Sequence, residues 1–235
     1  MSVAWSYSSL SLFKQCARKY YRLRIAKDVK ESSAKHLIYG NAVHKACEDY
    51  GRDGTELPKE YAFVKPHVDK LLAAKGEKLF EYRMGLTKEL EPCKFFDKVV
   101  WWRGIADLVV INGDTALLVD YKTGKSAKYA DTKQLQLLSL ALFAHFEEVQ
   151  TIKGGLLFLV SKEFIPITFA RDVIESGWTY WNKDVSRLEM CMDADTWNPQ
   201  ENFTCRNYCP VTDCEYNGNN CCLLYTSDAA DDLLC

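Results

Sequence analysis

Hydrophobic residues along the chain follow two different periods. Over five stretches they recur every three or four residues, as on the buried face of an amphipathic helix. The helices expected on this ground span residues 9–21, 40–50, 58–74, 132–146 and 174–192. Other stretches alternate apolar and polar residues or are apolar throughout, as strands do. The strands expected span residues 78–86, 99–111, 116–122, 155–160 and 164–169.

The order of these elements predicts an α/β or α+β domain with a mixed central β-sheet flanked by helices. We expect Cys16 to lie within the first helix, and Pro66 to kink or divide the third. Pro166 places the last strand at an edge of the sheet, because proline cannot donate to a neighbouring strand. Residues 221–235 fit none of this pattern and resemble translated sequencing-adapter read-through, so we exclude them from the fold.

Composition narrows the class of protein. The chain has 235 residues, of which 48% are hydrophobic, and a net charge of −2, which is typical of one folded domain rather than a disordered chain. No apolar run approaches the roughly 20 residues of a membrane span, and the first residues lack the pattern of a signal peptide. We therefore expect a cytoplasmic protein with no membrane contact. Its ten cysteines are then free for metals or for burial rather than for disulfides.

The centre of the chain predicts a hairpin. Two short apolar runs, residues 108–111 and 116–119, flank Asn112-Gly113, a dipeptide that readily forms a tight turn. If these two residues form the turn, Asp107 faces Leu118 on the opposite strand.

Three charged residues at the open end of this hairpin then share one face of the sheet. They are Asp107, Asp120 and Lys122, with the two carboxylates as diagonal neighbours whose Cβ atoms lie about 7–8 Å apart. Single acids at strand ends are usually solvated, and the spacing alone fits that reading as well as a functional site. The apolar runs beside them favour a site, because an unpaired charge there is costly without a metal or a partner.

A basic segment lies near the start of the chain. Residues 14–30 carry seven lysines and arginines against one acid, with tyrosines among them. Such a segment can follow a phosphate backbone, although a run of charge is more often a solvated helix face. The candidate nucleic-acid contacts are Arg18, Lys19, Tyr21 and Arg22, together with Lys125 after the hairpin.

Three cysteines near the other end predict a metal site. Cys205, Cys209 and Cys214 fall within ten residues among turn-forming residues. A tetrahedral site needs a fourth ligand, for which Cys16 is one candidate and Cys221 or Cys222 a local one. Zinc and a [4Fe–4S] cluster both accept four thiolates, and the spacing does not separate them from each other.

With His44, Gly104-x-x-Asp107, Asp120-x-Lys122 and Gln134 in this order, the chain resembles the PD-(D/E)XK nuclease superfamily. More narrowly it resembles the RecB/AddB-type branch, which includes CRISPR-associated iron–sulfur exonucleases and phage nucleases. The resemblance covers residues 5–217 and implies a restriction-endonuclease-like core. Taken alone, a histidine such as His44 on an apolar helix face is more often a half-buried side chain than a ligand.

The resemblance also implies roles for these residues. His44, Asp107, Asp120 and the carbonyl of Tyr121 would bind Mg²⁺ or Mn²⁺, Lys122 would assist the attack on phosphate, and Gln134 would support it. Members of the branch that carry a cluster take one cysteine from the N-terminal helix and three from the C-terminal segment, an arrangement that matches the four residues Cys16, Cys205, Cys209 and Cys214.

The function implied is a metal-dependent DNA nuclease, an exonuclease in DNA replication, recombination or repair that works with a helicase or recombination protein. The rival is a non-catalytic nucleic-acid-binding or scaffold protein with a cysteine metal site. In domain terms, we expect a nuclease domain over residues 1–204, a cysteine-rich metal-binding segment over 205–220 and a non-native tail over 221–235.

Overall fold

The computed structural model describes residues 4–31, 35–128 and 130–218. The chain forms two compact units, one of residues 1–6 and 33–181 and the other of residues 7–32 and 182–235. The boundary predicted at residue 205 stays a prediction, and the tail from residue 221 lies outside the described residues. Within the described part of the chain, no helix has the length and apolar character needed to cross a membrane.

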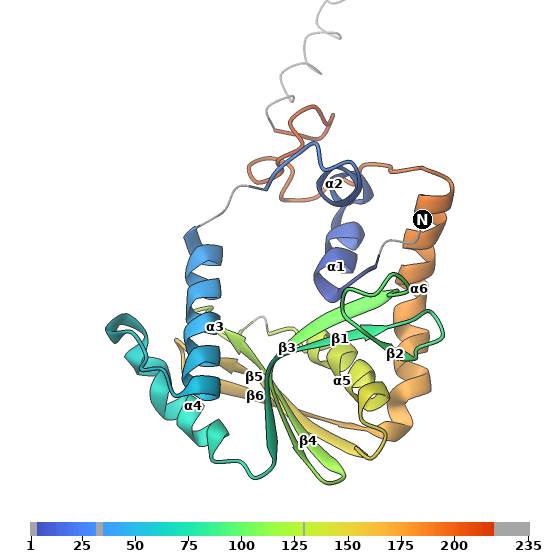
Figure 1. Cartoon of the computed structure of the whole chain (residues 1–235). Helices are drawn as coiled ribbons and strands as arrows, with labels where there is room; N and C mark the ends of the chain where they lie inside the picture. Colours follow the sequence, from blue (N-terminus) through green and yellow to red (C-terminus); the bar gives the residue numbers. More distant parts are fainter. Residues whose placement is uncertain (1–3, 32–34, 129, 219–235) are drawn as a thin grey trace, which may run out of the picture. The chain divides into compact units, whose positions relative to one another are not determined.

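The first unit is built on a mixed six-stranded sheet in the order β2-β1-β3-β4-β5-β6 (Figure 1). The strands are β1 Glu77–Leu86, β2 Pro92–Cys93, β3 Trp102–Asn112, β4 Thr115–Lys122, β5 Thr151–Phe158 and β6 Glu163–Ala170. All neighbouring strands are antiparallel except β4 and β5, which are parallel. The predicted mixed sheet is therefore confirmed, and β6, which contains Pro166, is an edge strand as expected.

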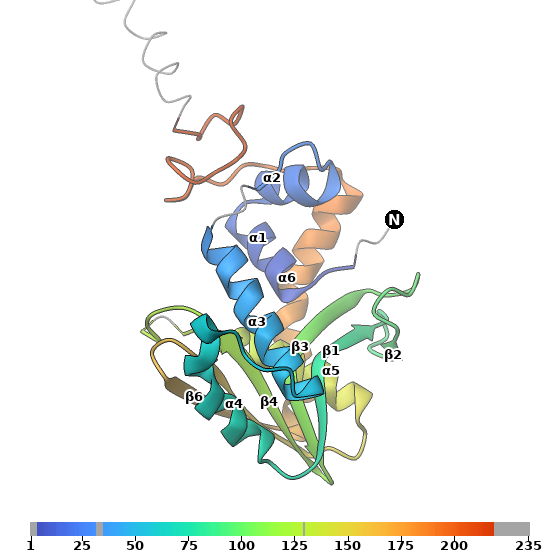
Figure 2. The same ribbon diagram turned by 60° about the vertical axis from the view of Figure 1, so that its left-hand side comes forward.

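Helices cover both faces of this sheet (Figures 1 and 2). They are α3 Lys35–Asp53, the 3-10 helix η2 Lys59–Val64, α4 Lys65–Leu72, α5 Lys133–His145, the short η3 Arg171–Val173 and α6 Ile174–Asp193, which continues into the second unit. On one face α3 and α4 bury Val43, Cys47 and Val68 against the apolar residues of β3, β4 and β5. On the other face lies α5, and α6 packs closely on it at Gly177, where an added Cβ would meet Leu140.

The central hairpin has a different turn from the one predicted. Asn112 pairs with Thr115, so the turn residues are Gly113 and Asp114 rather than Asn112 and Gly113. Gly113 has a φ of +60°, which suits the first position of a type II′ turn. The predicted register is wrong by two residues along β4. Because side chains alternate with a period of two, this shift leaves each side chain on its predicted face.

The side chains of strand β1 stop alternating regularly between the two faces of the sheet at Glu81. Phe80 packs with Leu108 in the core beneath α3 and α4, whereas Tyr82 lies against His145 at the end of α5. Glu81 between them has a φ of +48°, a left-handed conformation that is uncommon for a residue with a Cβ. The predicted alternation, with Phe80 and Tyr82 on one face, is therefore wrong at this point.

The second unit begins with α1 Tyr7–Gln15, α2 Ala17–Tyr20 and the π-helical turn η1 Tyr21–Ile25. The single helix predicted here is interrupted at Cys16, whose backbone is extended with φ −167° and ψ 114°. The Cys16 sulfur accepts the backbone N–H of Lys19 and so caps α2. The prediction that Cys16 lies within a helix is wrong. Its backbone is not helical, because its side chain accepts a backbone N–H group at the start of α2.

Candidate active site

Three side chains from different elements of the first unit converge next to the hairpin. His44 comes from α3, Glu81 from β1 and Asp107 from β3, and one ligand atom of each lies within 4.8 Å of those of the other two. The register of β1 and β3 places Glu81 directly opposite Asp107, because the residues on either side of them are paired. The two carboxylates and the imidazole can therefore contact one cation.

Asp107 uses its two oxygens for different contacts. Oδ1 lies 3.2 Å from Nδ1 of His44, and Oδ2 accepts a hydrogen bond of 2.6 Å from the backbone N–H of Tyr121. The β3–β4 ladder ends just before this point, with the pair Leu108–Val119. The side chain of Asp107 thus replaces a ladder hydrogen bond and fixes the carboxylate in place.

Asp120 and Lys122 follow on β4. Asp120 is only 4% exposed, and its Oδ2 lies 2.7 Å from Nζ of Lys122. The same ammonium group donates to Oε1 of Gln134 at 3.1 Å. Gln134 is in the first turn of α5, and Asp131 accepts the N–H of Lys133 at the start of this helix. The lysine is therefore held between a buried carboxylate and an amide.

The electrostatics of these residues favour a bound cation. Burial and, next, the nearby charge of Asp107 raise the pKa of Asp120 to about 6, although Lys122 acts in the opposite direction. Burial and the charge of Asp107 also raise the pKa of Glu81. Burial lowers the pKa of His44, but its hydrogen bond to Asp107 and the surrounding carboxylates outweigh this, so the net shift is upward. The carboxylates repel one another unless a positive charge lies between them.

The donor set fits a divalent metal. Mg²⁺ and Mn²⁺ prefer carboxylate oxygen, and an imidazole nitrogen is a common additional ligand. His44, Glu81 and Asp107 supply these atoms at short mutual distances. Asp120, in electrostatic contact with both Asp107 and His44, adds a fourth group beside them.

Comparison with known proteins agrees with this geometry. The family model described as the PD-(D/E)XK nuclease superfamily matches residues 4–214. The chain belongs to this superfamily. Its members are nucleases, that is, phosphodiester hydrolases that use divalent metals. No curated protein matches the sequence.

Two solved structures resemble this chain. A protein from Eubacterium rectale described as "Putative exonuclease" is 10% identical with a TM-score of 0.55, over 88% of this chain and 86% of the other. The structure named SSO0001 is 13% identical with a TM-score of 0.47, over 90% of this chain and 85% of the other. At these identities the likeness concerns the fold alone.

The structure brings together most of the residues predicted for the site, and it adds one. His44, Asp107, Asp120, Lys122 and Gln134 lie side by side as described above, and the Tyr121 backbone is bonded to Asp107. Glu81 was missed, because the alternating pattern of β1 placed it on a polar face with Arg83. Its left-handed backbone turns it to the site, and nothing in the local sequence indicates that conformation.

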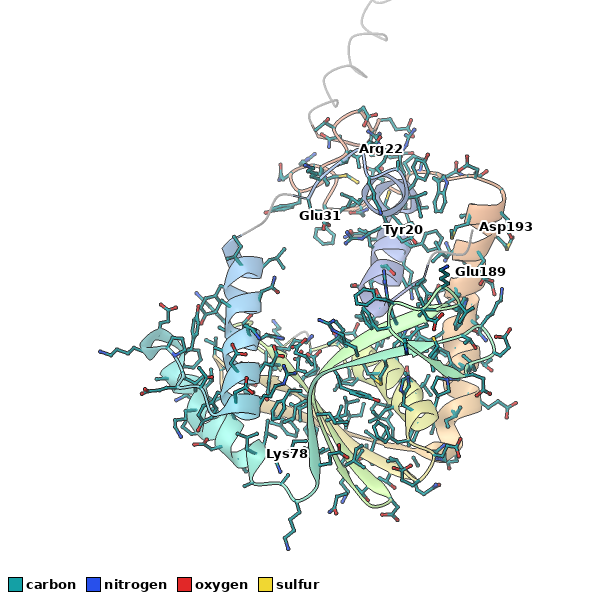
Figure 3. All side chains as sticks on the ribbon, in the orientation of Figure 1. Tyr20, Arg22, Glu31, Lys78, Glu189 and Asp193 are labelled. Atoms are coloured by element: carbon teal, nitrogen blue, oxygen red, sulfur yellow. The ribbon has the colours of Figure 1, made fainter. Side chains whose placement is uncertain are left out.

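The basic segment lies in the second unit, and several of its side chains have partners there (Figure 3). Arg22 forms ion pairs with Asp28 at 2.8 Å and Asp213 at 2.7 Å. Tyr21 stacks on Trp197 with ring centroids 5.3 Å apart. Arg18 and Lys19 remain near the surface beside the cysteines, while Lys125 is exposed in the first unit. Their contact with nucleic acid stays a prediction.

The four predicted cysteines meet in the second unit. Cys16, Cys205, Cys209 and Cys214 line one small cavity. Backbone N–H groups point at two of the sulfurs: those of Lys19 and Gln200 at Cys16, 3.5 and 3.4 Å away, and that of Asn202 at Cys205, 3.4 Å away. Such donors stabilise a thiolate. The local alternatives, Cys221 and Cys222, lie outside the described residues.

Proposed function

We propose that the chain is a deoxyribonuclease of the RecB/AddB-type branch that uses Mg²⁺ or Mn²⁺ and acts as an exonuclease. The observation that carries this is the convergence of His44, Glu81 and Asp107 within 4.8 Å beside the Asp120–Lys122 pair. A non-catalytic scaffold has no need of a lysine held between a buried acid and Gln134. The fold neighbour described as "Putative exonuclease" supports the choice of exonuclease.

The residues of the site have different roles in the proposed hydrolysis. His44, Glu81, Asp107 and Asp120 would hold the metal, and the carbonyl of Tyr121 stays a predicted further ligand. A divalent ion held there would supply an activated water and would neutralise charge that builds on the phosphate. Lys122, fixed by its two partners, orients the attacking water and stabilises negative charge on the phosphate oxygens.

The reaction is the hydrolysis of a phosphodiester. An oxygen of water bonds to phosphorus, and the bond from phosphorus to the leaving sugar oxygen breaks. Water gives up a proton and the leaving sugar oxygen takes one up, so the products are a phosphate monoester and a sugar hydroxyl. This chemistry suits a protein of DNA replication, recombination or repair, acting alongside a helicase or a recombination protein.

The cysteine site is a second part of the proposal. We propose that Cys16, Cys205, Cys209 and Cys214 bind a [4Fe–4S] cluster, with Zn²⁺ as the alternative. The four cysteines line one small cavity, and both groups accept four thiolates. The cluster is preferred because cluster-bearing members of the branch that the chain resembles take one cysteine from the N-terminal helix and three from the C-terminal segment. The site would tie residues 205–220 to the start of the second unit.

The nuclease assignment is tested with purified protein and labelled DNA. We expect the wild type to release short products from linear single- or double-stranded DNA with Mg²⁺ or Mn²⁺, and none with EDTA. A circular substrate left intact identifies an exonuclease, and its cleavage identifies an endonuclease. DNA binding without cleavage under every metal condition would support the non-catalytic scaffold instead.

The cysteine site is tested by metal analysis after anaerobic purification. We expect about four irons and four sulfides per chain, and their loss in Cys16→Ser. The control is Cys93→Ser, because Cys93 lies in the first unit on β2. Stoichiometric zinc would change the metal and keep the site, whereas neither metal in the wild type would contradict it.

A further inference from the structure

The connection between β1 and β3 carries two adjacent aromatic residues. The rings of Phe95 and Phe96 meet edge to face with centroids 4.9 Å apart. Phe96 is 74% exposed, and Val99 in the same connection is 61% exposed. A phenylalanine this exposed contributes little to the core, and it contradicts the usual tendency of aromatic rings to be buried.

Two arginines lie over these rings. The guanidinium of Arg83 is 5.8 Å from the centroid of Phe95 and 6.0 Å from that of Phe96, and the guanidinium of Arg103 is 5.5 Å from Phe95. Among the residues that the structure describes, neither guanidinium forms an ion pair with a carboxylate. Both positive charges are therefore available to an anionic ligand.

This cluster adjoins the candidate active site. Arg83 follows Glu81 by two positions on β1, and Arg103 lies on β3 with Asp107. In the β1–β3 ladder Arg83 pairs with Ile105 and Arg103 with Gly85. Both arginines therefore lie on the two paired strands that carry Glu81 and Asp107.

A groove extends from the same place along the edge of β1. Glu81 and Arg83 line it together with Arg52 and Lys78, and Lys78 is labelled at the start of the strand in Figure 3. This edge is open because β2 pairs only with Gly85 and Leu86. The groove therefore adds the ammonium of Lys78 beside Glu81, whereas the guanidinium of Arg52 is paired with Glu48.

We propose that Phe95, Phe96, Arg83 and Arg103, here called the aromatic platform, bind the unpaired end of a nucleic-acid strand and deliver its backbone to the metal site. Exposed rings stack on bases while neighbouring cations hold phosphates, which is how proteins bind single strands without reading sequence. The bases of a duplex are already stacked on each other, so the platform selects single-stranded or frayed ends. This inference rests on the proposed function and specifies its substrate.

The test measures binding in EDTA, where no cleavage occurs, by fluorescence anisotropy with a labelled oligothymidine and an abasic strand of equal length. The wild type should bind the oligothymidine more tightly than the abasic strand, because only the former offers bases to stack. Phe96→Ala should remove this difference with a loss of about tenfold. Arg83→Ala should weaken the binding of both strands, because its charge contacts phosphate.

Two exposed residues on other elements of the chain provide matched controls. Phe164→Ala on β6 and Arg187→Ala on α6 remove the same side-chain types and should leave both affinities unchanged. A duplex of equal length completes the set, and the platform predicts that it binds weakly.

The inference fails if the wild type binds the thymidine and abasic strands equally, or if Phe96→Ala matches the wild type. Tighter binding of the duplex than of the single strand would also overturn it. Failure of the nuclease assignment has a different signature, namely the absence of metal-dependent cleavage by the wild type. The two outcomes are therefore distinguishable.

Discussion

Asp107 accepts a 2.6 Å hydrogen bond from the backbone N–H of Tyr121. The bond joins β3 to β4 just beyond the last ladder pair, and it leaves the other carboxylate oxygen facing His44. One side chain therefore serves both the backbone of the hairpin and the candidate metal site.

Substitutions of Asp107 should separate these two roles. Asp107→Asn keeps an oxygen acceptor for Tyr121 but loses the negative charge, so we expect stability close to wild type and a loss of cleavage of at least about a hundredfold. Asp107→Ala also leaves a backbone N–H without its partner and should cost about 1–3 kcal/mol of unfolding free energy. Urea unfolding and a cleavage assay measure both. Equal stability of the two variants would contradict the role of the hydrogen bond.

Replacing Glu81 should raise the stability of the fold and lower its activity. Its φ of +48° is unfavourable for glutamate and easy for glycine. Glu81→Gly should therefore raise the unfolding free energy by about 1 kcal/mol, and it should lower both Mn²⁺ affinity and cleavage because a ligand is lost. Calorimetric metal titration and urea unfolding report the two effects.

A matched control exists for this prediction. Lys162 has a φ of +61° and is exposed in the turn between β5 and β6. Lys162→Gly should give a similar gain in stability with no change in cleavage. If Glu81→Gly retains wild-type Mn²⁺ affinity, Glu81 is no ligand.

Gln134 should act through Lys122 rather than on the metal. Its amide oxygen accepts from the ammonium of Lys122, so Gln134→Ala leaves the lysine less well positioned. We expect kcat to fall about tenfold with the Mn²⁺ concentration dependence unchanged. Gln136→Ala, two positions along the same helix, is the control. A change in metal dependence instead of in kcat would place Gln134 among the ligands.

His145 predicts a pH dependence of stability. Burial lowers its pKa below 6.5, although the hydrogen bond to the carbonyl of Gly85 acts in the opposite direction. Below pH 6.5 the unfolded chain then binds more protons at this residue than the folded chain does, so stability falls as pH falls. His145→Gln should lose less unfolding free energy between pH 7 and pH 5.5 than the wild type. Equal losses would show that His145 does not titrate with folding.

The site residues that strand alternation and turn signals predicted lie close together in the sequence, whereas the distant His44 was indicated by the resemblance to the nuclease superfamily. Asp107, Asp120, Lys122 and Gln134 lie on one hairpin and the helix that follows, where alternation and turn residues fix relative positions. The turn was predicted at the wrong residues, but the predicted faces of the side chains stayed correct, because a register error of two residues leaves each side chain on the same face of the strand.

The features that the sequence did not reveal depend on backbone conformation or on contacts between residues far apart in the sequence. Glu81 reaches the site through a positive φ, which no pattern of side chains indicates. The short strand β2 consists of Pro92 and Cys93 alone, too brief for any periodicity. Cys16 interrupts its helix because its sulfur accepts backbone N–H groups, one of them from Gln200 far along the chain.

The central claim is that the carboxylates clustered on this sheet support metal-dependent cleavage of DNA. The most direct measurement compares the wild type, Asp120→Ala and Asp114→Ala on end-labelled single-stranded DNA with Mn²⁺. Asp114 lies exposed in the turn of the same hairpin, so its variant should cleave like the wild type. Asp120→Ala should fold and show no cleavage above the EDTA background. Cleavage by Asp120→Ala at the wild-type rate would contradict the account.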